Sequence, residues 1–146
     1  MTHKASDIAK VFIKLADPEY GDLMSNLKLQ KLLYYVQGFH LAMYDSPFFA
    51  EDILAWEYGP VVNEVYQEYK TYASGAIPYN PEYMVPEEIT KEQLNLIQEV
   101  YHVYGQFSAH KLMNMTHNES PWKSTNRNGV ISHQKMKDYF LTQLDN

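Results

Sequence analysis

The sequence contains no cysteine. A chain without cysteine forms no disulfide, offers no thiolate nucleophile and holds no cysteine-ligated metal. It also lacks any apolar run approaching the ~20 residues that a membrane-spanning helix needs. Residues 1–12 lack the basic, apolar and small-residue regions of a secretory signal. These absences predict a soluble cytoplasmic protein with no membrane partner.

Arginine is almost absent as well. Arg127 is the only one in the chain, and the formal net charge at pH 7 is −6. Nucleic-acid binding depends on dense lysine and arginine for phosphate contacts, and base recognition favours arginine. Acidic residues dominate residues 51–99, whereas the basic ones gather in residues 123–137. The balance predicts that nucleic acid is not a partner.

What the chain does contain is typical of a globular domain. It has 146 residues, of which 45% are hydrophobic, and it includes 13 tyrosines. This length is enough for one domain with a substantial core, so we expect a single domain over residues 1–146. The tyrosines have two interpretations that both stay open: many of them line a helical core with their hydroxyls at its rim, or they are contact residues of a protein–protein interface.

Apolar periodicity predicts a mainly α fold with about six helices and one or two short β segments in a single compact domain. The strongest helix runs from its cap, Asn26, to about Tyr44. Its wide apolar stripe predicts a central position, and Gly38 predicts close packing by another element. The stripe comprises Leu29, Leu32, Leu33, Val36, Phe39, His40 and Met43.

The other helices are predicted from capping residues and breakers. A first helix begins at Ser6 and ends near Asp17-Pro18. Three later ones begin at the capping box Thr90–Gln93, at Ser108 and at Ser132. Residues 74–88 are rich in proline, which predicts a loop there. This loop is either mobile or a protruding binding element. Val130-Ile131 is a candidate short strand.

The stretch from Asp52 to Lys70 reads DILAWEYGPVVNEVYQEYK. Alternating side chains predict an extended segment anchored by a buried Trp56. The Gly59-Pro60 pair predicts that the extended segment stops there, with Pro60 at the first position of the next helix. We interpret the stretch as a structural joint, because no catalytic motif accompanies it.

A search for chemistry finds no phosphate-binding glycine loop and no Gly-x-Ser-x-Gly nucleophile motif. His102, His110 and His117 are too widely spaced for a zinc helix. No metal, cofactor or catalytic residue is therefore predicted.

Two polar positions remain open to interpretation. His117 either forms a polar site tuned by Glu119 or caps a helix end while Trp122 folds back. Lys31, on the apolar helix beside Gln30, either extends to the surface or pairs with a carboxylate, with Glu57 and Glu64 as candidates. The structural interpretations are favoured in both cases.

Three stretches occur together in a recognisable order: NLKLQKLLYYVQGFHLA, AWEYGPVVNEVYQEYK and MTHNESPW, beginning at Asn26, Ala55 and Met115. The set closely resembles the Panacea-domain family, which includes phage-associated GepA-like proteins and SocA-like antitoxins. The matching signature positions are Leu29, Gln30, Lys31, Leu32, Leu33, Tyr34, Trp56, Tyr58, Gly59, Pro60, Val61, His117 and Trp122. The resemblance implies structural or toxin-binding roles for them.

The resemblance further implies an antitoxin of a toxin–antitoxin system, without catalysis or cofactor. It would neutralise a cognate toxin, encoded by an adjacent gene, through direct binding. The alternative within the family is an adaptor that delivers the toxin to a Clp-type protease. A hypothesis from another class is a small metal-dependent hydrolase using His117 and Glu119. A homo-oligomer stays open.

Overall fold

The computed structural model describes residues 2–144. They form a mainly helical fold with one two-stranded antiparallel sheet, which confirms the predicted class. Seven α-helices are present rather than about six. The elements are α1 (Ala5–Leu15), α2 (Asn26–Tyr44), β1 (Leu54–Trp56), β2 (Gly59–Val61), α3 (Asn63–Tyr69), α4 (Lys91–Tyr104), α5 (Ala109–His117), α6 (Ser120–Lys123) and α7 (His133–Leu141), with 3-10 turns at Pro18–Tyr20 and Lys70–Tyr72.

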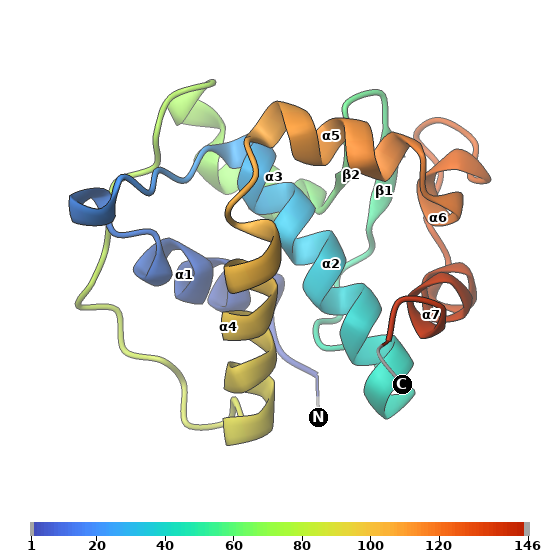
Figure 1. Cartoon of the computed structure of the whole chain (residues 1–146), viewed down its shortest axis with the longest axis horizontal. Helices are drawn as coiled ribbons and strands as arrows, with labels where there is room; N and C mark the ends of the chain where they lie inside the picture. The colour runs from blue at the N-terminus through green and yellow to red at the C-terminus, as the bar shows by residue number, and fades with distance from the viewer. Residues whose placement is uncertain (1, 145–146) are drawn as a thin grey trace.

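Helix α2 is the centre of the molecule. It runs diagonally through the fold, with α1 and α4 on one side and the hairpin, α6 and α7 on the other (Figure 1). Thirteen of its 19 residues are buried, including polar ones on several faces. A helix that is buried around most of its circumference must lie in the core. The predicted central position is confirmed, but the apolar stripe is only part of the buried surface, and Met43 at its end is exposed.

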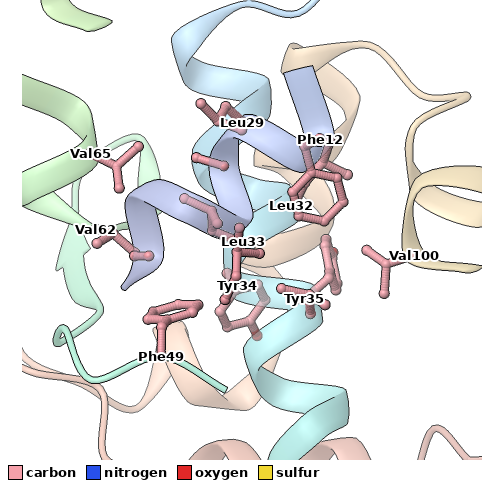
Figure 2. Close-up of a cluster of buried hydrophobic side chains, with 14 of the residues drawn as sticks. Phe12, Leu29, Leu32, Leu33, Tyr34, Tyr35, Phe49, Val62, Val65 and Val100 are labelled. Atoms are coloured by element: carbon pink, nitrogen blue, oxygen red, sulfur yellow. The ribbon is translucent and has the colours of Figure 1, made fainter. Parts of the chain in front are cut away.

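The core is one hydrophobic cluster built around α2. Figure 2 shows the leucines and tyrosines of α2 beside Phe12 of α1 and Val100 of α4. Val62, which precedes α3, and Val65 of α3 lie on the other side of the cluster. The ring of Tyr35 stacks on Tyr104 with centroids 3.9 Å apart. Aromatic pairs of this kind contribute stability beyond that which comes from the area they bury. Many tyrosines are therefore core residues, as one of the two interpretations expected.

Gly38 is the point where α7 packs against α2. A Cβ added to Gly38 would overlap the ring of Phe140. The close approach predicted from a glycine inside the helix is therefore confirmed. The missing side chain lets the fully buried Phe140 lie directly against the α2 backbone.

The segment around Gly59-Pro60 differs from the sequence prediction. Instead of ending an extended segment and opening a helix, Gly59, Pro60 and Val61 form β2, paired with β1 through Trp56↔Gly59, Ala55↔Pro60 and Leu54↔Val61. The intervening residues, Glu57 and Tyr58, make a tight turn. Because Gly59 adopts a left-handed φ of 106°, the chain reverses there. Helix α3 begins only at Asn63.

The opposite edge of β1 is covered by the segment after α6. The amide of Ala55 donates to the carbonyl of Gly129 (2.9 Å), and the amide of Ile131 donates to the carbonyl of Ile53 (2.8 Å). Leu54 and Val130 form an isolated bridge. The extended conformation predicted for Val130-Ile131 is therefore confirmed, although it is a bridge rather than a strand.

Helix starts follow the predicted caps in three of five cases. The Thr90–Gln93 capping box and the Ser108 and Ser132 caps are present. Ser25 rather than Asn26 caps α2, accepting the amide of Lys28. The Ser6 cap is wrong as well: α1 begins one residue earlier, and the Ser6 hydroxyl donates to Glu68 instead.

Residues 74–88 form the predicted loop, and three contacts fasten it to the domain. The amide of Ile77 donates to the carbonyl of Met24 (2.7 Å). Lys14 Nζ donates to the carbonyl of Tyr83 (2.7 Å), whose hydroxyl donates to Asp7 (3.2 Å). None of the helices in residues 2–144 combines the length and apolar character that crossing a bilayer requires.

Candidate functional site

The signature motifs of the sequence meet where α2 passes under the β1–β2 hairpin. Two polar side chains of α2 bond the backbone of β2 and of Val62, the residue that follows it. Gln30 Oε1 accepts the amide of Val62 (2.8 Å), and Lys31 Nζ donates to the carbonyl of Pro60 (3.0 Å). Gln30 is itself held by Asn26, whose Oδ1 accepts from Gln30 Nε2 (2.9 Å). Each of these buried backbone groups is thereby satisfied.

Among the residues that the structure describes, no carboxylate pairs with Lys31. Its side chain is fully buried, and loss of hydration lowers the pKa of its amine from 10.5 to about 7. Both expectations for this residue are wrong: it does not extend to the surface, and neither Glu57 nor Glu64 pairs with it, since both are exposed. The carbonyl of Pro60 takes the place of the expected carboxylate.

Gly59 is required by both its backbone and its surroundings. Its φ of 106° lies in the left-handed region that L side chains avoid. A Cβ at this position would also lie 2.6 Å from Lys31 Cε and 2.9 Å from Thr116 Oγ1. The hairpin, α2 and α5 therefore pack against one another at a glycine.

On the outer side, the chain around α5 and α6 binds the carbonyls at the tip of the hairpin. Trp122 Nε1 donates to the carbonyl of Trp56 (2.7 Å), and His117 Nε2 donates to the carbonyl of Glu57 (2.9 Å). The His117 and Trp122 rings stack at 4.1 Å, and the Arg127 guanidinium lies 3.6 Å from the Trp122 ring centre. These contacts hold the turn in place.

Glu119 does not tune His117. Its two carboxylate oxygens accept the hydroxyls of Tyr34 and Tyr35, each at 2.9 Å. Burial raises the pKa of Glu119 to about 7, although the tyrosine hydrogen bonds oppose this shift. The polar site proposed for His117 with Glu119 is therefore wrong. The capping interpretation is right for Trp122, which folds back, but His117 bonds the hairpin instead of its own helix end.

The signature residues divide into a buried and an exposed group. Trp56, His117 and Trp122 are partly exposed, and Trp56 packs edge-on against Tyr66 rather than serving as a buried anchor. Tyr58, at the tip of the turn, is 63% exposed. The buried ones are Leu29, Gln30, Lys31, Leu32, Leu33, Tyr34, Gly59, Pro60 and Val61.

Sequence reasoning overlooked two residues of this network, Gln37 and Thr116. Gln37 Oε1 accepts the amides of Phe48 (2.7 Å) and Phe49 (3.2 Å), and its Nε2 donates to the carbonyl of Phe49 (3.0 Å). A signal was available, because Gln30 and Gln37 are two helical turns apart on one face of an apolar helix. No feature of the sequence around Thr116 indicated that it would lie against Gly59.

Within residues 2–144, no group of three or more histidine, aspartate or glutamate side chains is arranged to hold a metal ion. The chemistry that the site offers is hydrogen bonding and aromatic contact at the hairpin tip, above a rigid buried network.

Comparison with known proteins agrees with the three motifs. The family model described as antitoxin SocA-like, Panacea domain, matches residues 29–123, well over half of the chain. This range includes every signature residue, so the predicted resemblance is confirmed. Neither the curated proteins nor the solved structures gave a match.

The geometry at Gly59 predicts a large loss of stability in Gly59→Val. Backbone strain and overlap with Lys31 together should lower the free energy of unfolding by roughly 2–5 kcal/mol. Gly21→Val is the matched control, since Gly21 has a φ of 78° but no atom within 4 Å of an added Cβ. It should lose only the strain, about 1–3 kcal/mol. Equal losses, measured by urea unfolding, would contradict the close approach.

Burial of Lys31 predicts an unusual pH dependence. Its folded pKa of about 7 lies below the ordinary 10.5, so the unfolded chain binds the proton more readily between these values. Stability should therefore fall as pH decreases from 10.5 toward 7 and rise as pH increases, by up to about 1.4 kcal/mol per unit. Lys31→Met should lack this slope, and the exposed control Lys111→Met should retain it. A slope unchanged in Lys31→Met would refute the assignment.

Proposed function

Because the chain belongs to the family of SocA-like antitoxins with a Panacea domain, we propose that it neutralises a cognate toxin by binding that toxin directly. The observation that carries this proposal is the family match over residues 29–123. The partner is a toxin protein encoded by an adjacent gene, and the two meet in the cytoplasm. The net charge of −6 favours a basic toxin surface, because opposite charge accelerates encounter.

The proposal assigns the whole chain, residues 1–146, to one antitoxin domain. Two helices outside the matched range support this extent. Ile8 and Phe12 of α1 and Phe140 of α7 are fully buried in the same core as the leucines of α2. Without α1 and α7, α2 would expose the faces that they cover.

The burial of most signature residues supports a scaffold role for them. Residues such as Leu32 and Gly59 are buried and have no surface to offer a partner, so their contribution is to hold the hairpin in position. Tyr58 differs, because it lies at the tip of the turn with 63% of its surface exposed. Exposed tyrosine combines contact area with a hydroxyl, a combination that interfaces favour. Tyr58 is the proposed toxin contact among the signature residues.

Co-expression tests the proposal. The product of the adjacent reading frame should be toxic alone and harmless together with this protein, and the two should elute as one complex in gel filtration. Tyr58→Ala should weaken complex formation about tenfold. Tyr20→Ala is the matched control, since Tyr20 is 81% exposed but outside the signature. An adjacent product that is toxic but neither bound nor neutralised would disprove direct binding.

Degradation through a Clp-type protease is the alternative mechanism. It is separated by the half-life of the toxin, measured with this protein present, in cells with and without the protease. Direct masking predicts the same half-life in both cell types. A toxin that disappears rapidly only when the protease is present would establish the adaptor mechanism instead.

A further inference from the structure

The structure contains a groove whose lining includes none of the signature residues. It lies between α4 and the C-terminal end of α2 and has a volume of about 510 Å³. Phe39, Leu96, Val100 and Tyr104 form its apolar lining, and Gln143 and Leu144 lie at one side.

This groove gathers apolar surface that is otherwise scattered. The described residues include ten exposed large apolar side chains, and three of them line the groove. Met43, Tyr44 and Val103 are 47%, 43% and 43% exposed. These three side chains extend the apolar lining of the groove to the protein surface.

The charge at the groove has one sign. Glu92 and Glu99 are exposed on α4, and they share one face of the helix with the buried Leu96 and the exposed Val103 at successive turns. The groove has no lysine, arginine or histidine among its lining residues. An apolar floor beside two carboxylates is complementary to a segment that carries apolar side chains flanked by basic ones.

We propose that this groove, between α2 and α4, is a docking site for a basic amphipathic helix of the toxin. The inference rests on the proposed function and adds a surface to it. A channel bounded by two helices fits a third, whose apolar face enters between them as in other helix-in-groove complexes. Lysine or arginine residues beside that face then meet Glu92 and Glu99.

A model peptide tests the chemistry of the groove without the toxin. The probe is an amphipathic helical peptide of leucine and lysine, compared with the same design in leucine and glutamate. Titration into the protein, followed by amide chemical shifts, should place the basic peptide on α4 and the end of α2. The acidic peptide should bind at least about tenfold more weakly.

Two charge-reversed proteins provide the matched comparison. Glu92→Lys/Glu99→Lys should lose about tenfold in affinity for the basic peptide and prefer the acidic one. Glu19→Lys/Glu64→Lys has the same net charge but alters exposed positions on other elements, and it should bind as the parent protein does. Shifts that map elsewhere, or equal losses in both variants, would overturn the proposal.

The cellular test separates this inference from the proposed function. In the co-expression assay, Glu92→Lys/Glu99→Lys should fail to neutralise the adjacent toxin, while Glu19→Lys/Glu64→Lys should succeed. If both variants protect as well as the parent protein, the toxin binds but not in this groove, so the inference is wrong and the function stands. If the parent protein itself does not protect, the function fails, and the toxin-docking role of the groove fails with it.

Discussion

The fold depends on polar side chains of one buried helix that satisfy the backbone of its neighbours. Gln30 accepts the amide of Val62, Gln37 accepts the amides of Phe48 and Phe49, and Lys31 donates to the carbonyl of Pro60. A buried amide or carbonyl without a partner costs on the order of 1–3 kcal/mol. Phe48, Phe49 and Val62 lie outside the regular sheet, and side chains of α2 bond their backbone instead. This role explains why the helix carries amide side chains within an apolar sequence.

The same arrangement explains how the signature relates to function. Its three motifs are distant in sequence but meet at the hairpin: the first supports β2 from below, the second is the hairpin, and the third bonds the carbonyls at its tip. Most of these side chains are inaccessible to a partner. In the proposed toxin-binding role, they would contribute only by fixing the surface on which Tyr58 and the α4 groove lie. The proposal assigns specificity to exposed residues such as Glu99 and Val103, which the signature does not include.

The sequence was informative where local physics decides the outcome. Apolar periodicity located α2, and the capping residues Thr90, Ser108 and Ser132 located three later helices. It failed at Pro60, whose local preference for a helix start was overridden by the left-handed Gly59 and by bonds from α2. The partner of Lys31 was also misjudged, because charge pairing suggested a carboxylate where packing provided a carbonyl. One of the two interpretations of His117 paired it with its sequence neighbour Glu119, whereas the fold brings Tyr34 and Tyr35 to Glu119 from α2.

Native-state hydrogen exchange tests the claim that α2 holds its neighbours individually. In the parent protein, the amides of Val62, Phe48 and Phe49 should exchange only through global unfolding. In Gln30→Leu, the Val62 amide should exchange at least about tenfold faster than global unfolding allows, while the Phe48 and Phe49 amides stay protected to the global limit. If the Val62 amide also stays at the global limit in Gln30→Leu, α2 does not hold this segment through its side chain, and the account is contradicted.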